Sequence, residues 1–175
     1  MKYIITALTG IAFASSLSAV ASAQQTKPLA YLEMETDSGS VDIAVTDHGP
    51  QAAKHSRSSS RVLNIVCAMN CTGVDYVEPV DEYPLGLFRL SDLNDLLFST
   101  WVGGSAYVVR AYKISAHGAV KVLDVHTIKS PEIFSGKNGH PEVKIYERAS
   151  QRSTTVIPAT LFWDGRRFIR AKPNS

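Results

Sequence analysis

The chain has 175 residues, 45% of them hydrophobic, which is enough for one domain with a buried core. It carries 18 lysine and arginine residues against 16 aspartate and glutamate residues, so its formal net charge is only +2. Nucleic-acid-binding domains show a strong basic excess, and anionic membrane surfaces also attract basic proteins. The composition therefore argues against nucleic acid and membrane as partners.

The first 23 residues have the features of an export signal. Lys2 provides a short positive region, and Ile4–Val20 is mostly apolar or small. Ala21-Ser22-Ala23 fits the small-x-small rule for cleavage. The apolar stretch is short and interrupted, and no cysteine lies near the cut, so neither a membrane anchor nor a lipid anchor is expected. We expect cleavage after Ala23, leaving residues 24–175 as one soluble domain in a bacterial periplasm.

Two strands are expected near the start of this domain, at Leu29–Glu35 and Ser40–Val45. The Thr36–Gly39 segment between them contains Asp, Ser and Gly, which are typical of a hairpin turn. Thr46–Arg61 follows and contains a Gly-Pro pair and four serines. This composition predicts a long exposed loop.

Cys67 and Cys71 follow a predicted strand at Val62–Ala68. Two cysteines in an oxidising compartment are expected to pair as a disulfide. Four residues of extended strand span ~13 Å, beyond disulfide reach, so the bond requires the chain to turn at Ala68–Asn70. A redox or metal site is the alternative, although two cysteines do not by themselves close a zinc site.

Two further segments are predicted to be irregular surface connections. Val74–Tyr83 is acidic, contains Pro79 and ends before Pro84. Ser130–Pro141 is rich in Ser, Pro, Gly and Asn. Proline and these small polar residues disfavour a strand interior and are typical of loops.

The middle of the chain predicts an antiparallel meander of three strands, at Leu96–Val102, Ala106–Ile114 and Val120–Thr127. Tight turns at Gly103-Gly104 and His117-Gly118 join them, because glycine-containing pairs between β-branched and aromatic runs are typical of hairpins. The strands carry apolar residues at both odd and even positions. A strand that is apolar on both faces is covered on both faces, so we expect this meander to lie centrally, between stacked sheets.

The last part of the chain predicts three more strands. Glu142–Arg148 alternates apolar and polar residues, and Val156–Trp163 is a second apolar run. Asp164-Gly165 predicts a type I′ hairpin turn that leads to a last strand at Arg166–Ala171. Only Ser91–Asp95, which could cap a short helix, competes with an extended interpretation. The predicted fold class is all-β: a single domain of antiparallel meanders in stacked or propeller-blade-like sheets.

Two segments resemble each other, each with an Asn-containing turn and an acidic residue before an apolar strand: FRLSDLNDLLF at 88–98 and FSGKNGHPEVKI at 134–145. This unit resembles the turn-then-strand unit of FG-GAP-like propeller-blade modules. The closing LFWDGRRFI at 161–169 resembles the terminal hairpin of exported bacterial proteins with such modules. Asp92, Asn94 and Asp95 do not reproduce the calcium-binding aspartates of FG-GAP loops, so neither calcium nor another cofactor is expected.

The signal, the size and the all-β pattern together are similar to small periplasmic immunity proteins that protect bacteria from secreted peptidoglycan amidases. Members of that class insert a turn into the active-site cleft of the toxin. The resemblance implies that the turn at Gly103, Gly104 and Ser105 contacts a protein partner, a cell-wall hydrolase. The simpler interpretation is that this turn only joins two strands.

No catalytic residues are predicted. Ser105 lies in Gly103-Gly104-Ser105-Ala106-Tyr107, where Tyr107 replaces the second glycine of a nucleophile elbow. The SxxK, HExxH and CxxC motifs do not occur. The chain's histidines are scattered and predict no metal site: His48, His55, His117, His126 and His140.

Three functions therefore remain as hypotheses. The first is an inhibitor or immunity protein that blocks a cell-wall hydrolase. The second is an exported FG-GAP-like binding or scaffold module without inhibitory activity. The third, which we disfavour because no catalytic motif occurs, is an enzyme with an unrecognised site.

Overall fold

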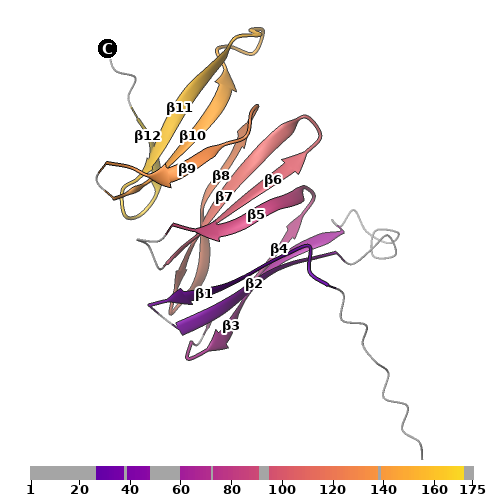
Figure 1. The fold of residues 1–175 in the computed structure, drawn as a ribbon, viewed down its shortest axis with the longest axis vertical. Coiled ribbons are helices and arrows are strands. Elements are labelled where there is room, and N and C mark those ends of the chain that lie inside the picture. Colours follow the sequence, from indigo (N-terminus) through magenta and orange to yellow (C-terminus); the bar gives the residue numbers. More distant parts are fainter. Residues whose placement is uncertain are drawn as a thin grey trace, which may run out of the picture.

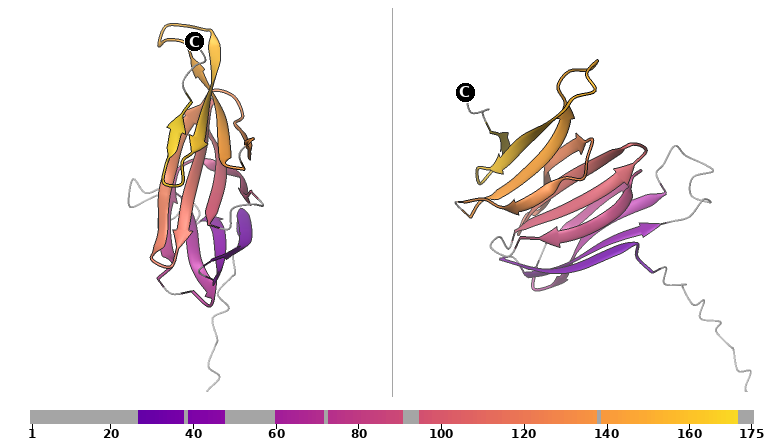
Figure 2. Two further views of the ribbon diagram at one scale, coloured as in Figure 1. Left: turned by 90° about the vertical axis from the view of Figure 1, so that its left-hand side faces the viewer. Right: turned by 45° about the horizontal axis from the view of Figure 1, so that its top comes forward.

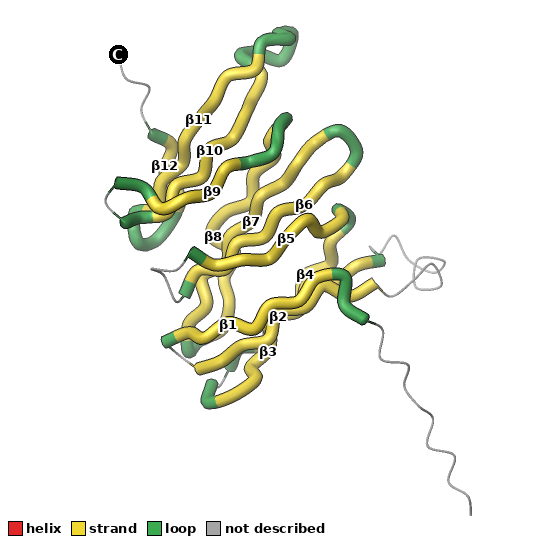
Figure 3. Tube along the Cα trace, viewed as in Figure 1, coloured by secondary structure: helices red, strands yellow, loops and turns green. Residues whose placement is uncertain are grey.

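The computed structural model describes residues 27–37, 39–47, 60–71, 73–90, 95–137 and 139–171. These residues form strands joined by turns and loops, as the tube in Figure 3 shows. The described part of the chain contains no helix, and so none that is long and apolar enough to cross a membrane. The predicted signal at residues 1–23, its cleavage site and residues 48–59 of the predicted loop lie outside the described residues.

Twelve strands among the described residues form three four-stranded antiparallel sheets (Figure 1). The first sheet contains β1 (Ala30–Thr36), β2 (Gly39–Asp47), β3 (Arg61–Met69) and β4 (Asp75–Val80). The middle sheet contains β5 (Tyr83–Arg89), β6 (Leu96–Gly103), β7 (Ala106–Ser115) and β8 (Gly118–Thr127). The third sheet contains β9 (Glu132–Ser135), β10 (Pro141–Arg148), β11 (Val156–Trp163) and β12 (Phe168–Arg170). In each sheet the strands pair in chain order, so each sheet is a meander.

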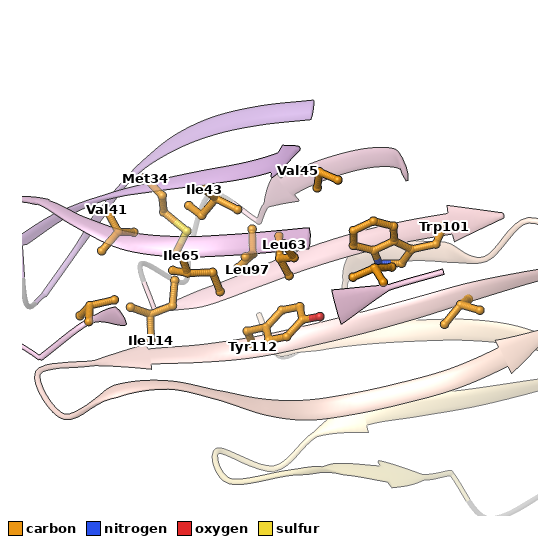
Figure 4. Close-up of a cluster of buried hydrophobic side chains, with 13 residues drawn as sticks. Met34, Val41, Ile43, Val45, Leu63, Ile65, Leu97, Trp101, Tyr112 and Ile114 are labelled. Atoms are coloured by element: carbon orange, nitrogen blue, oxygen red, sulfur yellow. The ribbon is translucent and has the colours of Figure 1, made fainter. Parts of the chain in front are cut away.

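The middle sheet lies between the other two, as both Figure 1 and Figure 2 show. One hydrophobic core fills the space between the first and middle sheets, and Figure 4 shows its side chains. A second core lies between the middle and third sheets. Along β7, Val108 and Tyr112 belong to the first core, whereas Val109 and Ala111 belong to the second. The predicted all-β fold, with a central meander covered on both faces, is therefore confirmed.

Val109→Ala is expected to lower the free energy of unfolding by ~1–3 kcal/mol. The side chain is 0% exposed, so the substitution removes buried methyl groups and leaves a cavity between two sheets. Chemical denaturation at neutral pH measures the change. Val120→Ala is the matched control, since Val120 lies in the same sheet but is 62% exposed. A Val109→Ala midpoint equal to that of the control would exclude this position from the core.

The acidic segment Val74–Tyr83 is not irregular as predicted, because it contains β4 and the start of β5. Its prolines are tolerated because both strands lie at sheet edges, where a residue without an N–H group breaks no ladder. Pro79 lies in β4, and Pro84 lies in β5 beside a register shift between Pro84 and Gly86. The edge position, which the sequence does not show, explains the error.

Two other predictions are corrected near the C-terminus. Ser130–Pro141 contains the short strand β9, which pairs with β10. The β11–β12 connection has four residues, since Trp163 pairs with Phe168, and not the two residues of a type I′ turn. Asp164 Oδ1 accepts hydrogen bonds from the backbone N–H groups of the third and fourth loop residues, both at 2.8 Å. This side chain closes a longer loop than the Asp-Gly pair predicts.

Smaller boundary differences accompany these corrections. Thr46, Asp47 and Arg61 belong to β2 and β3 and not to the predicted loop. Leu96 and Leu97 begin β6, so the competing helix does not extend into them. Residues 91–94 of that candidate helix, and of the first FG-GAP-like segment, lie outside the described residues, as does residue 138 of the second segment.

Cys67 and Cys71 form the predicted disulfide, with their Cα atoms 5.6 Å apart. The chain bends at Asn70, which has a φ of 60° and follows the end of β3. Asparagine adopts this left-handed conformation more readily than most residues. The disulfide thus closes the β3–β4 connection at one end of the first sheet.

Candidate functional site

The candidate turn joins β6 to β7 in the middle sheet. Val102 pairs with Tyr107 and Gly103 pairs with Ala106, so Gly103 belongs to β6. The turn itself is Gly104-Ser105, one residue later than predicted. Of these two residues only Gly104 has a positive φ, 60°. That is the pattern of a type II′ hairpin turn, which places glycine first.

The two glycines of this hairpin serve different purposes: Gly103 packs closely against Glu82, and Gly104 adopts a positive φ. A Cβ atom at Gly103 would lie 2.8 Å from Cγ of Glu82, so a side chain there would force Glu82 of the β4–β5 connection to move. A Cβ atom at Gly104 would meet no atom within 4 Å. Gly103, Gly104 and Ser105 are all exposed. The tip of the hairpin therefore extends away from the rest of the protein, and its base packs against Glu82.

The strands that carry this tip are buried next to it. Trp101 is 0% exposed and its indole N–H donates to Oγ of Ser99 at 2.8 Å. Val108, which pairs with Trp101 across the hairpin, is also buried. Trp101 is therefore part of the core between the first and middle sheets. Because the strands next to the tip are buried, the tip has a fixed position, and a fixed loop loses less conformational entropy when it binds.

A buried arginine lies close to the base of the hairpin. Arg110 of β7 is buried, and its guanidinium carbon lies 5.5 Å from the centre of the Trp101 ring. Its Nη2 donates to both carboxylate oxygens of Glu82, at 3.1 and 3.2 Å. Its Nε lies 3.3 Å from Asp124 and 3.7 Å from Glu78. Arg110 thus connects the hairpin base to β4, β8 and the connection between the first two sheets.

Lys121 and two tyrosines complete this ionic cluster. Lys121 Nζ lies 3.0 Å from Glu78 and 2.6 Å from Asp124. The hydroxyls of Tyr76 and Tyr112 donate to the same oxygen of Glu78, at 2.7 and 3.0 Å. We call the set the Arg110 cluster: Arg110, Lys121, Glu78, Glu82, Asp124, Tyr76 and Tyr112. It contains three carboxylates and two cations.

The surroundings shift the pKa values of these groups. Burial, together with the charge of Glu78 and a hydrogen bond to it, raises the pKa of Tyr112 and of Tyr76 well above the usual range for tyrosine. Burial alone would raise the pKa of Asp124, but the hydrogen bond from Lys121 and the charge of Arg110 outweigh it and lower that pKa. Burial opposes the charged form of Arg110, yet Asp124 and Glu82 leave its pKa raised. The cluster therefore favours the charged forms of Arg110 and Asp124 and the neutral forms of both tyrosines.

Sequence reasoning identified the turn but missed the Arg110 cluster. The available signal was a single arginine in the apolar run Ala106–Ile114, together with the acidic residues of Val74–Tyr83. A charged residue in the middle of a buried strand needs a partner, but only the stacking of the sheets shows which acids provide it. Cys67 lies in β3 and Cys71 in the β3–β4 connection, and neither is among the residues of this cluster.

The arrangement offers an exposed, preorganised hairpin tip for contact with another molecule. Gly104 presents backbone without a side chain, and Ser105 presents a hydroxyl that can donate and accept hydrogen bonds. The Arg110 cluster lies near the base of the hairpin, and its charged groups form ion pairs mainly with one another. No protein-family model, no curated protein and no solved structure matches this chain.

Proposed function

We propose that this protein is a periplasmic immunity protein that binds and blocks a peptidoglycan-cleaving amidase toxin. The β6–β7 hairpin enters the active-site cleft of the enzyme, with Gly104 and Ser105 at its tip. One observation carries the proposal: the tip is exposed and a Cβ atom at Gly104 would meet no atom within 4 Å, while Trp101 and Val108 beside the tip are buried in the centre of the protein.

The chemistry of the tip suits a narrow catalytic cleft. Gly104 has no Cβ, so the backbone on both sides of it can approach catalytic groups closely. The Ser105 hydroxyl can donate to, or accept from, a catalytic histidine or cysteine. The contacts of Gly103 with Glu82, and of Glu82 with Arg110, hold the base of the hairpin. A preformed hairpin loses little conformational freedom when it binds.

The identity of the partner as a hydrolase and the insertion of the hairpin into a cleft are inferred from different observations. The hydrolase is inferred from the resemblance in size, signal and all-β pattern to immunity proteins of secreted amidases. The hairpin geometry supports insertion into a cleft, whichever enzyme provides it. The competing hypothesis is an exported binding or scaffold module that uses another surface.

Ser105→Arg is expected to weaken binding to the hydrolase at least ~10-fold, which corresponds to ~1.4 kcal/mol. A long cationic side chain at the tip conflicts sterically with a narrow cleft and with a protonated catalytic histidine. Because Ser105 is exposed, the melting temperature should stay nearly unchanged. Affinity capture from a periplasmic extract identifies the hydrolase, and calorimetry with the purified enzyme measures the affinity.

His117→Arg provides the matched control, because His117 is an exposed turn residue at the other end of β7. This variant is expected to bind and inhibit like the wild type. Unaltered affinity in Ser105→Arg would show that the hairpin is not the inhibitory element. If the wild type captures no cell-wall hydrolase, the immunity hypothesis gives way to the scaffold hypothesis.

A further inference from the structure

A cleft with a volume of about 300 Å³ lies between the middle and third sheets. The cleft is far from the candidate turn, because Ser115, at the end of β7, lines it, whereas the turn precedes the start of β7. Figure 1 shows the ribbon of β7 between these two ends. Its volume is at the lower limit of typical small-molecule sites, roughly 300 Å³. Six residues line it: Lys113, Ser115, Val120, Val122, Gly165 and Arg166.

The apolar part of the cleft comes from β8. Val120 is 62% exposed, although it lies in a strand of the central sheet, and Val122 is half-buried. Aliphatic side chains that stay exposed inside a concave surface gain free energy when an apolar group covers them. This part of the cleft therefore suits an aliphatic group of small size.

The charged part of the cleft is positive. Two cations line it, Lys113 and Arg166, and no carboxylate does. Lys113 is already engaged, since its Nζ lies 3.7 Å from Asp95 and donates to the carbonyl of Gly165 at 3.5 Å. Within the part of the chain that the structure describes, the guanidinium of Arg166 has neither an ion pair nor a hydrogen bond.

The loop that carries Arg166 is held in place by its own backbone contacts. Asp164 Oδ1 accepts hydrogen bonds from the N–H groups of Arg166 and Arg167, both at 2.8 Å. The N–H of Asp164 in turn donates to the carbonyl of Arg167 at 3.1 Å. These contacts hold the loop backbone from which the exposed side chain of Arg166 lines the apolar cleft.

We propose that this cleft binds an aliphatic group that ends in a carboxylate. The aliphatic part packs against Val120 and Val122, and the guanidinium of Arg166 donates two parallel hydrogen bonds to the carboxylate. A free short-chain carboxylic acid and the C-terminal residue of a peptide both have this chemistry. The site lies apart from the hairpin and does not depend on the proposed inhibitory function.

The test is an NMR titration of the full-length mature protein with hexanoate, hexanol and hexylamine as probes. Hexanoate is expected to cause saturable shifts of the amide signals of Val120, Val122 and Gly165. Hexanol should bind at least ~10-fold more weakly, and hexylamine should not bind at these residues. Equal binding of hexylamine, or the absence of saturable shifts with hexanoate and with the peptide below, would overturn the proposal.

Arg166→Gln is expected to weaken hexanoate binding at least ~10-fold. Arg167→Gln is the matched control, since Arg167 is its neighbour but its Nε lies 4.0 Å from Asp164 and its side chain is 78% exposed. The control should bind hexanoate like the wild type. If Arg166→Gln binds as tightly as Arg167→Gln, Arg166 is not the carboxylate partner and the proposal fails.

A second titration distinguishes the two sources of the carboxylate. The probe is the tetrapeptide Ac-Gly-Gly-Ala-Leu, with a free or an amidated C-terminus. Tighter binding of the free peptide than of hexanoate identifies a peptide C-terminus as the ligand class, whereas tighter binding of hexanoate identifies a small carboxylic acid. Equal binding of the free and amidated peptides, without binding of hexanoate, would contradict carboxylate recognition.

Discussion

Arg110→Met is expected to lower the free energy of unfolding by about 3–5 kcal/mol near neutral pH. The substitution keeps a long side chain but leaves Glu78, Glu82 and Asp124 with Lys121 as their only cation in the Arg110 cluster. The side chains of Glu78 and Glu82 are only 14% and 17% exposed, so water stabilises their negative charges poorly. The expected loss is mainly the cost of buried carboxylates without a partner and not the net value of the ion pairs.

Chemical denaturation measures this loss, and Lys113→Met is the matched control. Lys113 lies on the same strand, but its side chain is 40% exposed and its nearest carboxylate oxygen is 3.7 Å away. An exposed pair of this kind contributes at most ~1 kcal/mol. Equal destabilisation by the two substitutions would contradict the role given to the Arg110 cluster. If Arg110→Met does not fold, Glu82→Gln, which keeps the arginine, is expected to fold and to be less stable than the wild type.

Stability is expected to fall steeply as the pH rises above ~10, the usual pKa of tyrosine. Tyr76 and Tyr112 have raised pKa values, because Tyr112 is buried, Tyr76 is half-buried, and both donate to the carboxylate of Glu78. A group with a raised folded-state pKa contributes stability that is complete below its unfolded pKa and is lost as the pH rises toward its folded pKa. The titration of each tyrosine therefore lowers the free energy of unfolding by up to ~1.4 kcal/mol per pH unit in this range.

Denaturation curves measured between pH 8 and roughly 12 test this expectation, together with tyrosinate absorbance on the same samples. Tyr112→Phe removes one titrating group and should make the decline with pH shallower. Tyr107→Phe is the control, since Tyr107 lies on the same strand but its hydroxyl does not donate to Glu78. A wild-type stability that does not change up to pH 12, or equal slopes in the two variants, would contradict the argument.

The sequence predicted the strands that have regular apolar patterns and clear turn residues. β6, β7, β10 and β11 lie where the pattern places them, because alternating or continuous apolar runs reflect burial directly. β4, β5 and β9 were missed because they are edge strands, where proline and charged residues are acceptable. The neighbours of a strand, which decide whether a proline is tolerated there, are not visible in the strand itself.

Only the local part of the candidate site could be predicted from the sequence, because the rest depends on neighbours that are distant in the chain. The turn is local, and its glycine pair indicated a hairpin to within one residue. The Arg110 cluster joins residues from β4, β7, β8 and the β4–β5 connection, so it depends on how two sheets stack. An arginine within an apolar strand implies that it has partners, but the sequence analysis missed this signal, and the strand itself does not show which acids provide them. The cleft beside Arg166 depends in the same way on the third sheet packing against the middle one.

Hydrogen–deuterium exchange of the wild-type protein, alone and bound to the captured hydrolase, tests the central claim most directly. The claim predicts that the amides of Gly104 and Ser105, in the exposed turn, exchange quickly in the free protein, and that exchange across residues 102–107 is much slower in the complex. Residues 116–118 and 164–167, at the other end of β7 and in the β11–β12 loop, are expected to exchange at the same rate in both states. Protection at those residues, with exchange at 102–107 unchanged by binding, would contradict the claim that the β6–β7 hairpin enters the partner.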